Sequence, residues 1–237
     1  MSLQSTKTRR KILGVDHEDT LWSMAYLAST YRNQGRWLEA EELSVQVMQT
    51  RETKFEVDHP DTLTSINNLA SIYSSQGKWM EAEKLFMQVM ETRTTKFGAD
   101  HPDTLTSINN PAWIYSSQGK WMEAEKLFMQ VIETCKTKLR ADHPETLFSM
   151  SNLALTYRKQ GRWKEAEELN LRVMETRKRV LGDKHPDTLT SMNNLALTFW
   201  DQGRWQEAER LFVEVTGIYL RQHLGTSIPP RWLARTT

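Results

Sequence analysis

The chain repeats one sequence pattern every 42 residues. An Asp-His or Lys-His step recurs with this spacing, and its histidines are His17, His59, His101, His143 and His185. A Gly-Arg/Lys-Trp step recurs in the same register, with its tryptophans at Trp37, Trp79, Trp121, Trp163 and Trp205. Self-similarity at a fixed period of about 20–50 residues is typical of arrays in which each unit buries its apolar face against its neighbours. The chain is therefore expected to fold as an array of similar units.

The copy that begins at Asp58 predicts two helices joined by a short turn. Asp58 or His59 is the expected cap of the first helix, and Pro60 lies just inside it, where its missing N–H would be unpaired in any case. The apolar stripe of this first helix is Leu63, Ile66, Leu69, Ala70 and Tyr73. Gly77 ends the helix, since the residue after a helix often needs a positive φ. The stripe of the second helix is Trp79, Ala82, Leu85, Phe86, Val89 and Met90, again at helical spacing.

Other arrays have similar periods, of about 40–47 residues in HEAT and armadillo repeats and about 40–45 in propeller blades. A propeller blade needs four strands, and no segment here alternates apolar and polar residues as a strand would. Ala70 and Ala82 match the positions where the two helices of a tetratricopeptide repeat approach closely. We therefore expect an all-α fold, a tetratricopeptide-repeat right-handed superhelical solenoid of five helix-turn-helix repeats of about 42 residues.

The register predicts the organisation of the whole chain. Residues 1–15 align with the end of a second helix and are expected to be the tail of a truncated preceding repeat. The five repeats span residues 16–222, divided as 16–57, 58–99, 100–141, 142–183 and 184–222. Residues 223–237 are expected to form an irregular C-terminal tail, because their proline pair does not allow another first helix.

The third repeat departs from its neighbours at two positions that we expect to be structurally informative. Pro111 stands in the interior of its first helix, where proline removes a hydrogen bond and costs about 3 kcal/mol or more. This helix is expected to be bent or locally unwound there, through drift or, less expectedly, through selection for a kink. Cys135, the single cysteine of the chain, is interpreted as a drifted surface position.

The repeated motif resembles the kinesin-light-chain class of tetratricopeptide repeats. The string is His-Pro-Asp-Thr-Leu-x-Ser-x-Asn-Asn-Leu-Ala, followed by Gln-Gly-Arg/Lys-Trp-x-Glu-Ala-Glu, with Trp where that class more often has Tyr. The array is also similar to the repeat region of fungal STAND-type nucleotide-binding receptors. Neither the heptad coiled coil of a light chain nor a phosphate-binding loop of a receptor ATPase occurs in the sequence.

The composition and the motifs give little support to a catalytic, metal-binding, nucleic-acid-binding or membrane-bound protein. The formal net charge is +1, so we expect no nucleic-acid partner. No stretch approaches the ~18 apolar residues of a membrane span, and we expect no membrane partner and a reducing, cytoplasmic location. The in-register histidines are interpreted as helix caps, because equivalent points of adjacent hairpins lie about 8–10 Å apart, too far to share a metal ion. We expect no catalytic residues, no metal and no cofactor, and therefore no enzyme activity.

The resemblance implies a ligand groove lined by the first helix of each repeat, with asparagines holding an extended peptide backbone. Asn67, Asn109 and Asn193 match that column, whereas Ser151 departs from it. An asparagine amide can donate and accept at once, which suits a peptide backbone.

Aromatic and basic residues fall on the same predicted surface. Trp22, Trp113 and Trp200 either line the groove or pack on a neighbouring first helix, and both interpretations stay open. The five in-register tryptophans of the second helices are expected to be core. Arg32, Arg158 and Lys159 would favour acidic segments.

Two classes of function follow from these expectations. The first is a non-enzymatic scaffold that binds short linear peptides, expected to be acidic and to contain an aromatic residue, as a kinesin-light-chain-like cargo or adaptor module. The second is a structural or vestigial array, or a sensor-repeat fragment of a STAND-type receptor, that acts by self-association. The last helix carries Leu211, Phe212, Val215 and Tyr219 with no following first helix to cover them. This end is expected to meet another subunit, a missing domain or a tail folded back through Ile228 and Trp232.

Overall fold

The computed structural model describes residues 3–224, and every helix or strand element in that range is an α-helix. The eleven helices of this range are α1 (Leu3–Leu13), α2 (Glu18–Asn33), α3 (Trp37–Lys54), α4 (Pro60–Ser75), α5 (Trp79–Phe97), α6 (Pro102–Ser117), α7 (Trp121–Lys138), α8 (Pro144–Lys159), α9 (Trp163–Leu181), α10 (Pro186–Asp201) and α11 (Trp205–Leu224). We call the even-numbered helices A and the odd-numbered helices B. The predicted all-α class is confirmed.

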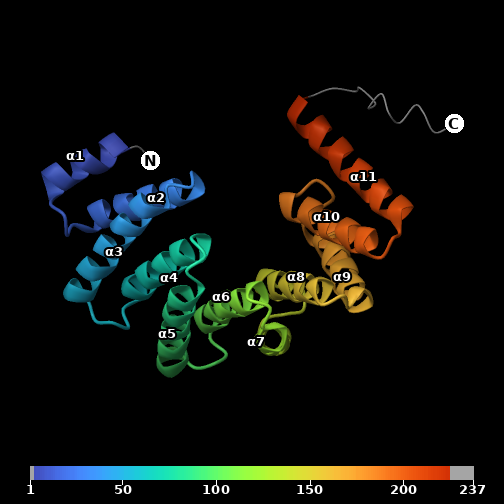
Figure 1. Cartoon of the computed structure of the whole chain (residues 1–237), viewed down its shortest axis with the longest axis horizontal. Coiled ribbons are helices and arrows are strands. Elements are labelled where there is room, and N and C mark those ends of the chain that lie inside the picture. The colour runs from blue at the N-terminus through green and yellow to red at the C-terminus, as the bar shows by residue number, and fades with distance from the viewer. Residues whose placement is uncertain (1–2, 225–237) are drawn as a thin grey trace. The chain divides into compact units, whose positions relative to one another are not determined.

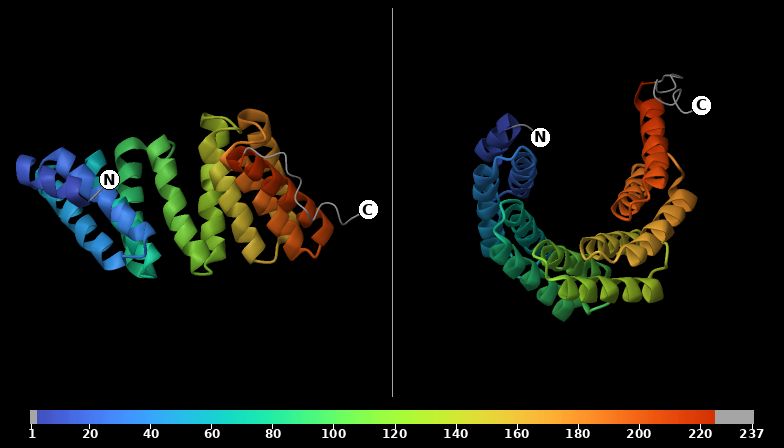
Figure 2. Two further views of the ribbon diagram at one scale, coloured as in Figure 1. Left: turned by 90° about the horizontal axis from the view of Figure 1, so that it is seen from above. Right: turned by 45° about the vertical axis from the view of Figure 1, so that its right-hand side comes forward.

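The helices form two compact units, which we describe separately. Unit 1 (Met1–Gly119) holds α1 to α6, and unit 2 (Lys120–Thr237) holds α7 to α11. Within each unit consecutive helices pack against one another, and α2 also contacts α4, as α8 contacts α10. In unit 1, helices A form one layer and helices B the other (Figures 1 and 2). The handedness of a superhelix formed by the whole chain stays a prediction.

Each helix A begins at a histidine cap. Nδ1 of His59 accepts a hydrogen bond from the backbone N–H of Asp61 at 3.2 Å. The same bond forms at His17, His101, His143 and His185. A cap of this kind satisfies one of the N–H groups that the first turn of a helix leaves free. The interpretation of the repeated histidine as a cap is confirmed. In residues 3–224 no group of three or more His, Cys, Asp or Glu side chains is placed to hold a metal ion.

The turn from helix A to helix B depends on a glycine. Gly77 has a φ of 76°, and this left-handed conformation lets the N–H of Lys78 reach back to the carbonyl of Tyr73 at 2.9 Å. The equivalent glycines of the other four turns have φ between 74° and 78°. A residue with a Cβ is strained in this region, so the recurring glycine sets the tight connection that the sequence predicts.

The hairpins close around small and branched apolar residues. Ala70 and Ala82 are both fully buried and lie in one cluster with Phe86, which confirms the predicted close approach of α4 and α5. A second cluster joins Leu63 and Ile66 of α4 to Val89 of α5. The core of the second repeat is thus formed by its own hairpin and by the flank of the next helix A, through Ile114.

The proline of the third repeat does not interrupt its helix. α6 runs without a break from Pro102 to Ser117 with Pro111 buried inside it, so the predicted local unwinding is wrong. A bend without loss of helical structure stays a prediction. The surrounding packing of α6 against α5 supports helical geometry even where one backbone bond is lost.

Both ends of the described range add to the predicted repeats. α1 packs on α2, where Nη1 of Arg9 donates to Oγ of Ser23 at 3.2 Å. α11 reaches Leu224, so residues 223 and 224 are helical instead of irregular. The remainder of the predicted tail, including Ile228 and Trp232, lies outside the described residues. Within residues 3–224 there is no helix with the length and apolar character of a membrane span.

Candidate functional site

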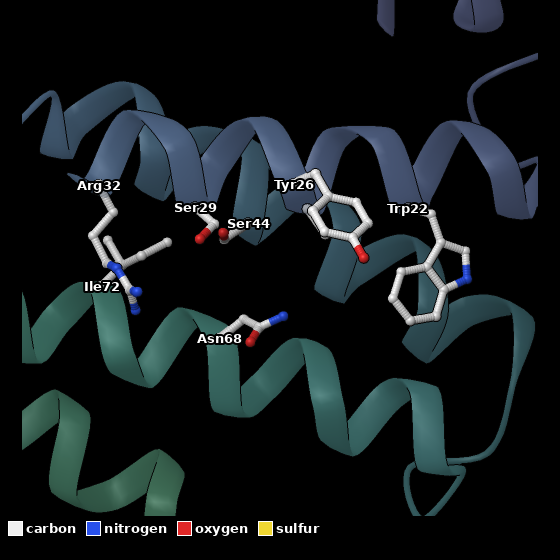
Figure 3. Close-up of a pocket in the computed structure, with 8 residues that line it drawn as sticks. Trp22, Tyr26, Ser29, Arg32, Ser44, Asn68 and Ile72 are labelled. Atoms are coloured by element: carbon white, nitrogen blue, oxygen red, sulfur yellow. The ribbon is translucent and has the colours of Figure 1, made fainter. Parts of the chain in front are cut away.

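A cavity of about 230 Å³ opens in unit 1 between α2, α3 and α4. Figure 3 shows its side chains: Trp22, Tyr26, Ser29 and Arg32 extend from α2 toward α4, and Asn68 points back from α4. These positions of α2 are four or three residues apart, which places them along one face of the helix. The cavity therefore lies along the A-helix surface that the sequence predicts to bind a ligand.

The polar groups of this cavity are available for a ligand. Arg32, Ser29 and Asn68 have no side-chain hydrogen bond or ion pair with another residue in the described part of the chain, 3–224. Arg32 offers five N–H donors in a fixed plane, and Asn68 offers a donor pair and an acceptor. No carboxylate lines the cavity, so its electrostatic preference is for an acidic group.

The aromatic wall is specific to the first repeat. Trp22 and Tyr26 are both exposed, with ring centroids 6.3 Å apart. In the second repeat the same two positions hold Thr64 and Asn68. The sequence pattern predicts Trp22 and Arg32 on this surface but not Tyr26, although a tyrosine in a column of asparagines distinguishes this repeat from the others.

A buried guanidinium packs against the indole of Trp22. Arg51 of α3 is only 1% exposed, and its guanidinium carbon lies 5.2 Å from the Trp22 ring centroid. Its Nη1 donates to the carbonyl of Asp61 at 3.0 Å, and its Nη2 donates to Glu18 at 3.3 Å. The indole is thus positioned over a cation that is itself fixed by two helices A, which favours a constant ring orientation.

The predicted asparagine column does not form a uniform row of free amides. Asn67 is half-buried, and its Oδ1 accepts a hydrogen bond from Asn110 of α6 at 2.6 Å. Asn109 is only 3% exposed, so the expectation that it faces a ligand is not met. Asn193 of unit 2 is half-buried. The column lies close to where neighbouring helices A meet, which buries part of it.

The other two predicted groove tryptophans are exposed but paired with helix B residues. Trp113 is 41% exposed, and its ring centroid lies 6.1 Å from that of Trp79. Trp200 is 50% exposed and forms an edge-on pair with Trp205 at 4.8 Å. Each indole is therefore partly exposed and packs on a tryptophan of a helix B, and its role in a ligand groove stays a prediction.

The two predicted basic residues of α8 differ in their availability. Nε of Arg158 pairs with Oδ2 of Asp201 at 2.9 Å, and Arg158 is half-buried. Lys159 is exposed at the last residue of the helix. Of this pair, Lys159 has the more accessible charge.

Two further expectations about single side chains are wrong. The in-register tryptophans at the start of helices B are not core, because Trp37, Trp121, Trp163 and Trp205 are exposed and Trp79 is half-buried. Each is the first residue of its helix, at the edge of the hairpin, so neighbours cover only part of the indole. Cys135 is fully buried instead of lying on the surface, and burial raises the pKa of its thiol.

A repeated polar contact joins successive hairpins within a unit. Glu41 of α3 accepts hydrogen bonds from Gln76 and Lys78 of the following turn, each at 2.8 Å. Burial alone would raise the pKa of Glu41, but the bonds from Lys78 and Gln76 outweigh it, and the pKa is lowered. In unit 2 the equivalent contacts are Arg162 and Tyr157 with Glu125, and Arg204 and Gln202 with Glu167. Burial and the bond to Glu125 raise the pKa of Tyr157 to about 12. This ladder links a helix B to the next A–B turn.

Comparison with known proteins identifies the family. The tetratricopeptide repeat family model matches residues 19–94, 61–137, 114–177 and 145–221. The chain belongs to the tetratricopeptide repeat family.

Solved structures refine this assignment. A crystal structure of nearly identical TPR-like repeats of a putative kinesin light chain from Podospora anserina is 32% identical, with a TM-score of 0.69, and the match covers 87% of this chain and 98% of that one. A second crystal structure, of a substituted form of the same repeats, has the same identity and a TM-score of 0.71 over 86% and 96% of the two chains. BtubC (BKLC) from P. vanneervenii, at 18% identity with a TM-score of 0.73 over 96% and 91%, shares the fold. None of the curated protein sequences compared with the chain matches it. The repeats are thus kinesin light chain-like.

Proposed function

We propose that this chain is a non-enzymatic protein–protein interaction scaffold that binds a short linear peptide in the cavity between α2 and α4. The observation that carries the proposal is the combination, within one cavity, of two exposed aromatic rings with unpartnered groups on Arg32 and Asn68. The family membership supports the general role, because repeat arrays present extended surfaces to partners. The light-chain-like repeats of the relatives make a cargo or adaptor role the expected context.

The cavity chemistry specifies the peptide. Trp22 and Tyr26 would receive one bulky apolar side chain, Asn68 would bond to the peptide backbone, and Arg32 would pair with a flanking Asp or Glu. An unstructured peptide loses conformational entropy on binding, so we expect a dissociation constant in the roughly micromolar range. Asn67, Trp113, Asn193, Trp200, Arg158 and Lys159 remain proposed contacts for longer ligands, whereas the buried Asn109 is no longer among them.

The test uses residues that the chain itself tolerates at equivalent positions. A variant with Trp22→Thr, Tyr26→Asn and Arg32→Ser gives the first repeat the side chains of Thr64, Asn68 and Ser74. Titrated with peptides that carry Trp, Tyr, Phe or Leu between Asp and Glu, this variant should bind at least about tenfold more weakly than the unaltered chain. Trp163→Ala is the control, because it removes an exposed helix B indole outside the cavity and outside the other proposed contacts, and it should leave binding intact.

Single substitutions separate the two kinds of contact. Arg32→Ser should weaken binding and reduce its dependence on salt, because it removes a charge pair. Trp22→Thr should weaken binding with the salt dependence unchanged. Peptides that bind equally well to the triple variant would contradict the assignment of the cavity. The STAND-type origin and the cytoplasmic location stay predictions from the sequence.

A further inference from the structure

The contact between successive hairpins has two halves, and each half also occurs once without the other. The first half is a glutamate near the start of a helix B. Hydrogen bonds from the next turn reach this glutamate at Glu41, Glu125 and Glu167. The second half is the Gln-Gly-Arg/Lys turn of the next hairpin, whose side chains bond to that glutamate. The carboxylates concerned are 22–27% exposed, so the contact is partly sheltered from solvent.

Glu209 of α11 is the glutamate half without its partner. It aligns with Glu167, is exposed, and forms no ion pair with another residue of the described range 3–224. It lines a cavity of about 420 Å³ together with Trp200, Trp205 and Phe212. Phe212 aligns with Phe86 and Phe128, which are buried beneath the following helix A, whereas Phe212 itself is half-buried. The first two turns of α11 therefore keep the chemistry of a hairpin junction.

The turn after α2 is the other half. Arg36 pairs with Glu39 of its own helix and lies 3.9 Å from the Tyr31 ring centroid, as Arg162 does with Glu165 and Tyr157. Arg162 also holds Glu125 of the preceding hairpin, and Arg36 has no such partner among residues 3–224. Its side chain is 45% exposed, which leaves room for a second carboxylate.

α2 also has a position that the other helices A bury. Thr30 aligns with Ile72, Ile114, Thr156 and Thr198, and these four side chains are at most 2% exposed. Thr30 is only half-buried, and the hydrogen bonds of Thr6 and Arg9 in α1 are made to Ser23, seven residues before it. In unit 1, Ile114 packs on Phe86 of the preceding helix B. Thr30 thus marks the place where the first half of a helix B would lie.

We propose that the start of α11 in one copy of this chain docks on the end of α2 in a second copy. In this contact Glu209 pairs with Arg36, and Phe212 covers Thr30. The two surfaces are complementary in charge, and their contact repeats one that the chain already forms between its own hairpins. The site lies outside the peptide cavity between α2 and α4, although Trp200, a proposed contact for longer peptides, lines the same cavity as Glu209. The test of this proposal needs no peptide, so its failure is distinct from failure of the proposed function.

The contact is limited in extent and has no two-fold symmetry. α1 already packs on α2 and bonds to Ser23 in its first half, so the contact is limited to the end of α2 and the start of α11. The later part of α11 no longer follows the junction pattern, since Tyr219 replaces the arginine found at positions 51, 93 and 177. Because the two surfaces differ, each added copy presents a new free end, and the product is a weak, open series of oligomers rather than a discrete dimer.

Charge reversal of the full chain tests this directly. Sedimentation at increasing concentration should show a rising average mass for the unaltered chain and a monomer for Glu209→Arg and for Arg36→Glu. Mixing these two variants should restore the oligomers, because each then offers the charge that the other has lost. The double variant should also self-associate. Raised salt should weaken every association.

Two substitutions control for a general effect of charge. Glu168→Arg and Lys164→Glu make the same changes on exposed residues of α9 outside both surfaces. They should leave the oligomers intact. A chain that is monomeric at all concentrations, or oligomers that persist unchanged in both single variants, would overturn the proposal. A monomer whose compactness changes in Glu209→Arg without any concentration dependence would assign Glu209 to a partner within the same chain, and would also overturn it.

Discussion

The second and third repeats have nearly the same sequence, yet their second helices contact the following helix A through different groups. They differ at seven of 42 positions, which are Leu69/Pro111, Ser71/Trp113, Met90/Ile132, Arg93/Cys135, Thr94/Lys136, Phe97/Leu139 and Gly98/Arg140. In the second repeat, Nη1 of Arg93 donates to the carbonyl of Asp103 at 3.0 Å and so ties α5 to the first turn of α6. In the third repeat, the equivalent tie between α7 and α8 is replaced by the buried thiol of Cys135.

Neighbouring groups change with this replacement. Oγ1 of Thr146 donates to the carbonyl of Arg140 at 3.0 Å, whereas the equivalent hydroxyls of Thr20, Thr62, Thr104 and Thr188 are buried without a hydrogen bond among residues 3–224. Arg140 in turn pairs with Asp142 at 3.2 Å. The junction that lacks the arginine therefore satisfies one more buried hydroxyl. A junction between hairpins can thus be stabilised by a long cation or by a small apolar group with local hydrogen bonds.

The largest expected effect comes from making the second repeat resemble the third at its proline. Leu69 is buried in α4, so Leu69→Pro removes a backbone hydrogen bond and a core side chain and should lower stability by about 3 kcal/mol or more. Thermal and urea unfolding of the variant and of the unaltered chain measure this difference in the free energy of unfolding. Leu69→Ala is the control, and it should cost less because it retains the backbone N–H. Equal losses for both would show that α4 tolerates proline as α6 does.

The reverse change in the third repeat should raise stability. Pro111→Leu restores a donor inside α6 and the leucine that occupies this position in the second repeat, and we expect a gain of about 1–3 kcal/mol. Because α6 is helical with the proline in place, the gain should be smaller than the loss in Leu69→Pro. An unchanged or lower melting temperature would show that the packing around Pro111 has adapted to the ring.

A smaller effect is expected from exchanging the junction groups. Arg93→Cys removes the bond to the Asp103 carbonyl and should cost about 1–2 kcal/mol, as the loss of one charge-assisted hydrogen bond does. Cys135→Ala should cost a similar amount through a small cavity. The two variants can be distinguished by salt, because only the first removes a charge. If Arg93→Cys is neutral, the arginine tie does not stabilise its junction.

The buried thiol gives a direct measurement of local opening at the third junction. Burial raises the pKa of Cys135, so in the folded chain the thiol should react with an alkylating reagent far more slowly than in urea. Lys164→Glu, on the exposed surface of α9, serves as the control and should leave this rate unchanged. Rapid labelling of the folded chain would show that the α7–α8 junction opens readily.

Much of the fold could be predicted because the repeat presents the same local signals five times. The histidine cap, the glycine turn and the paired alanines each depend on neighbours within one hairpin, so a single sequence suffices. The exposure of Trp37 and the burial of Cys135 depend on how one hairpin lies on the next, which the period does not specify. The same holds for Asn109, which the sequence places in the predicted groove column but which is only 3% exposed. Of the two rings in the aromatic wall, the sequence predicted Trp22 but not Tyr26. Tyr26 replaces the asparagine of the other repeats, and the effect of that replacement depends on which side chains lie beside it in the folded chain.

The smallest effect on stability is expected at the tryptophan that only the third repeat has. Trp113 is partly exposed and contacts the Trp79 ring, so Trp113→Ser should cost no more than about 0.5–1.5 kcal/mol, the range of a single aromatic pair. Ser71→Trp is the matched change in α4, where Ser71 is half-buried and donates to the carbonyl of Asn67 at 2.9 Å. Because that change also adds bulk beside a neighbouring helix A, it should destabilise more than Trp113→Ser.

Fluorescence of the folded chain should lose an exposed indole in the first variant and gain one in the second. A loss of several kcal/mol in Trp113→Ser would show that this indole is part of the core and would remove it from the proposed peptide contacts.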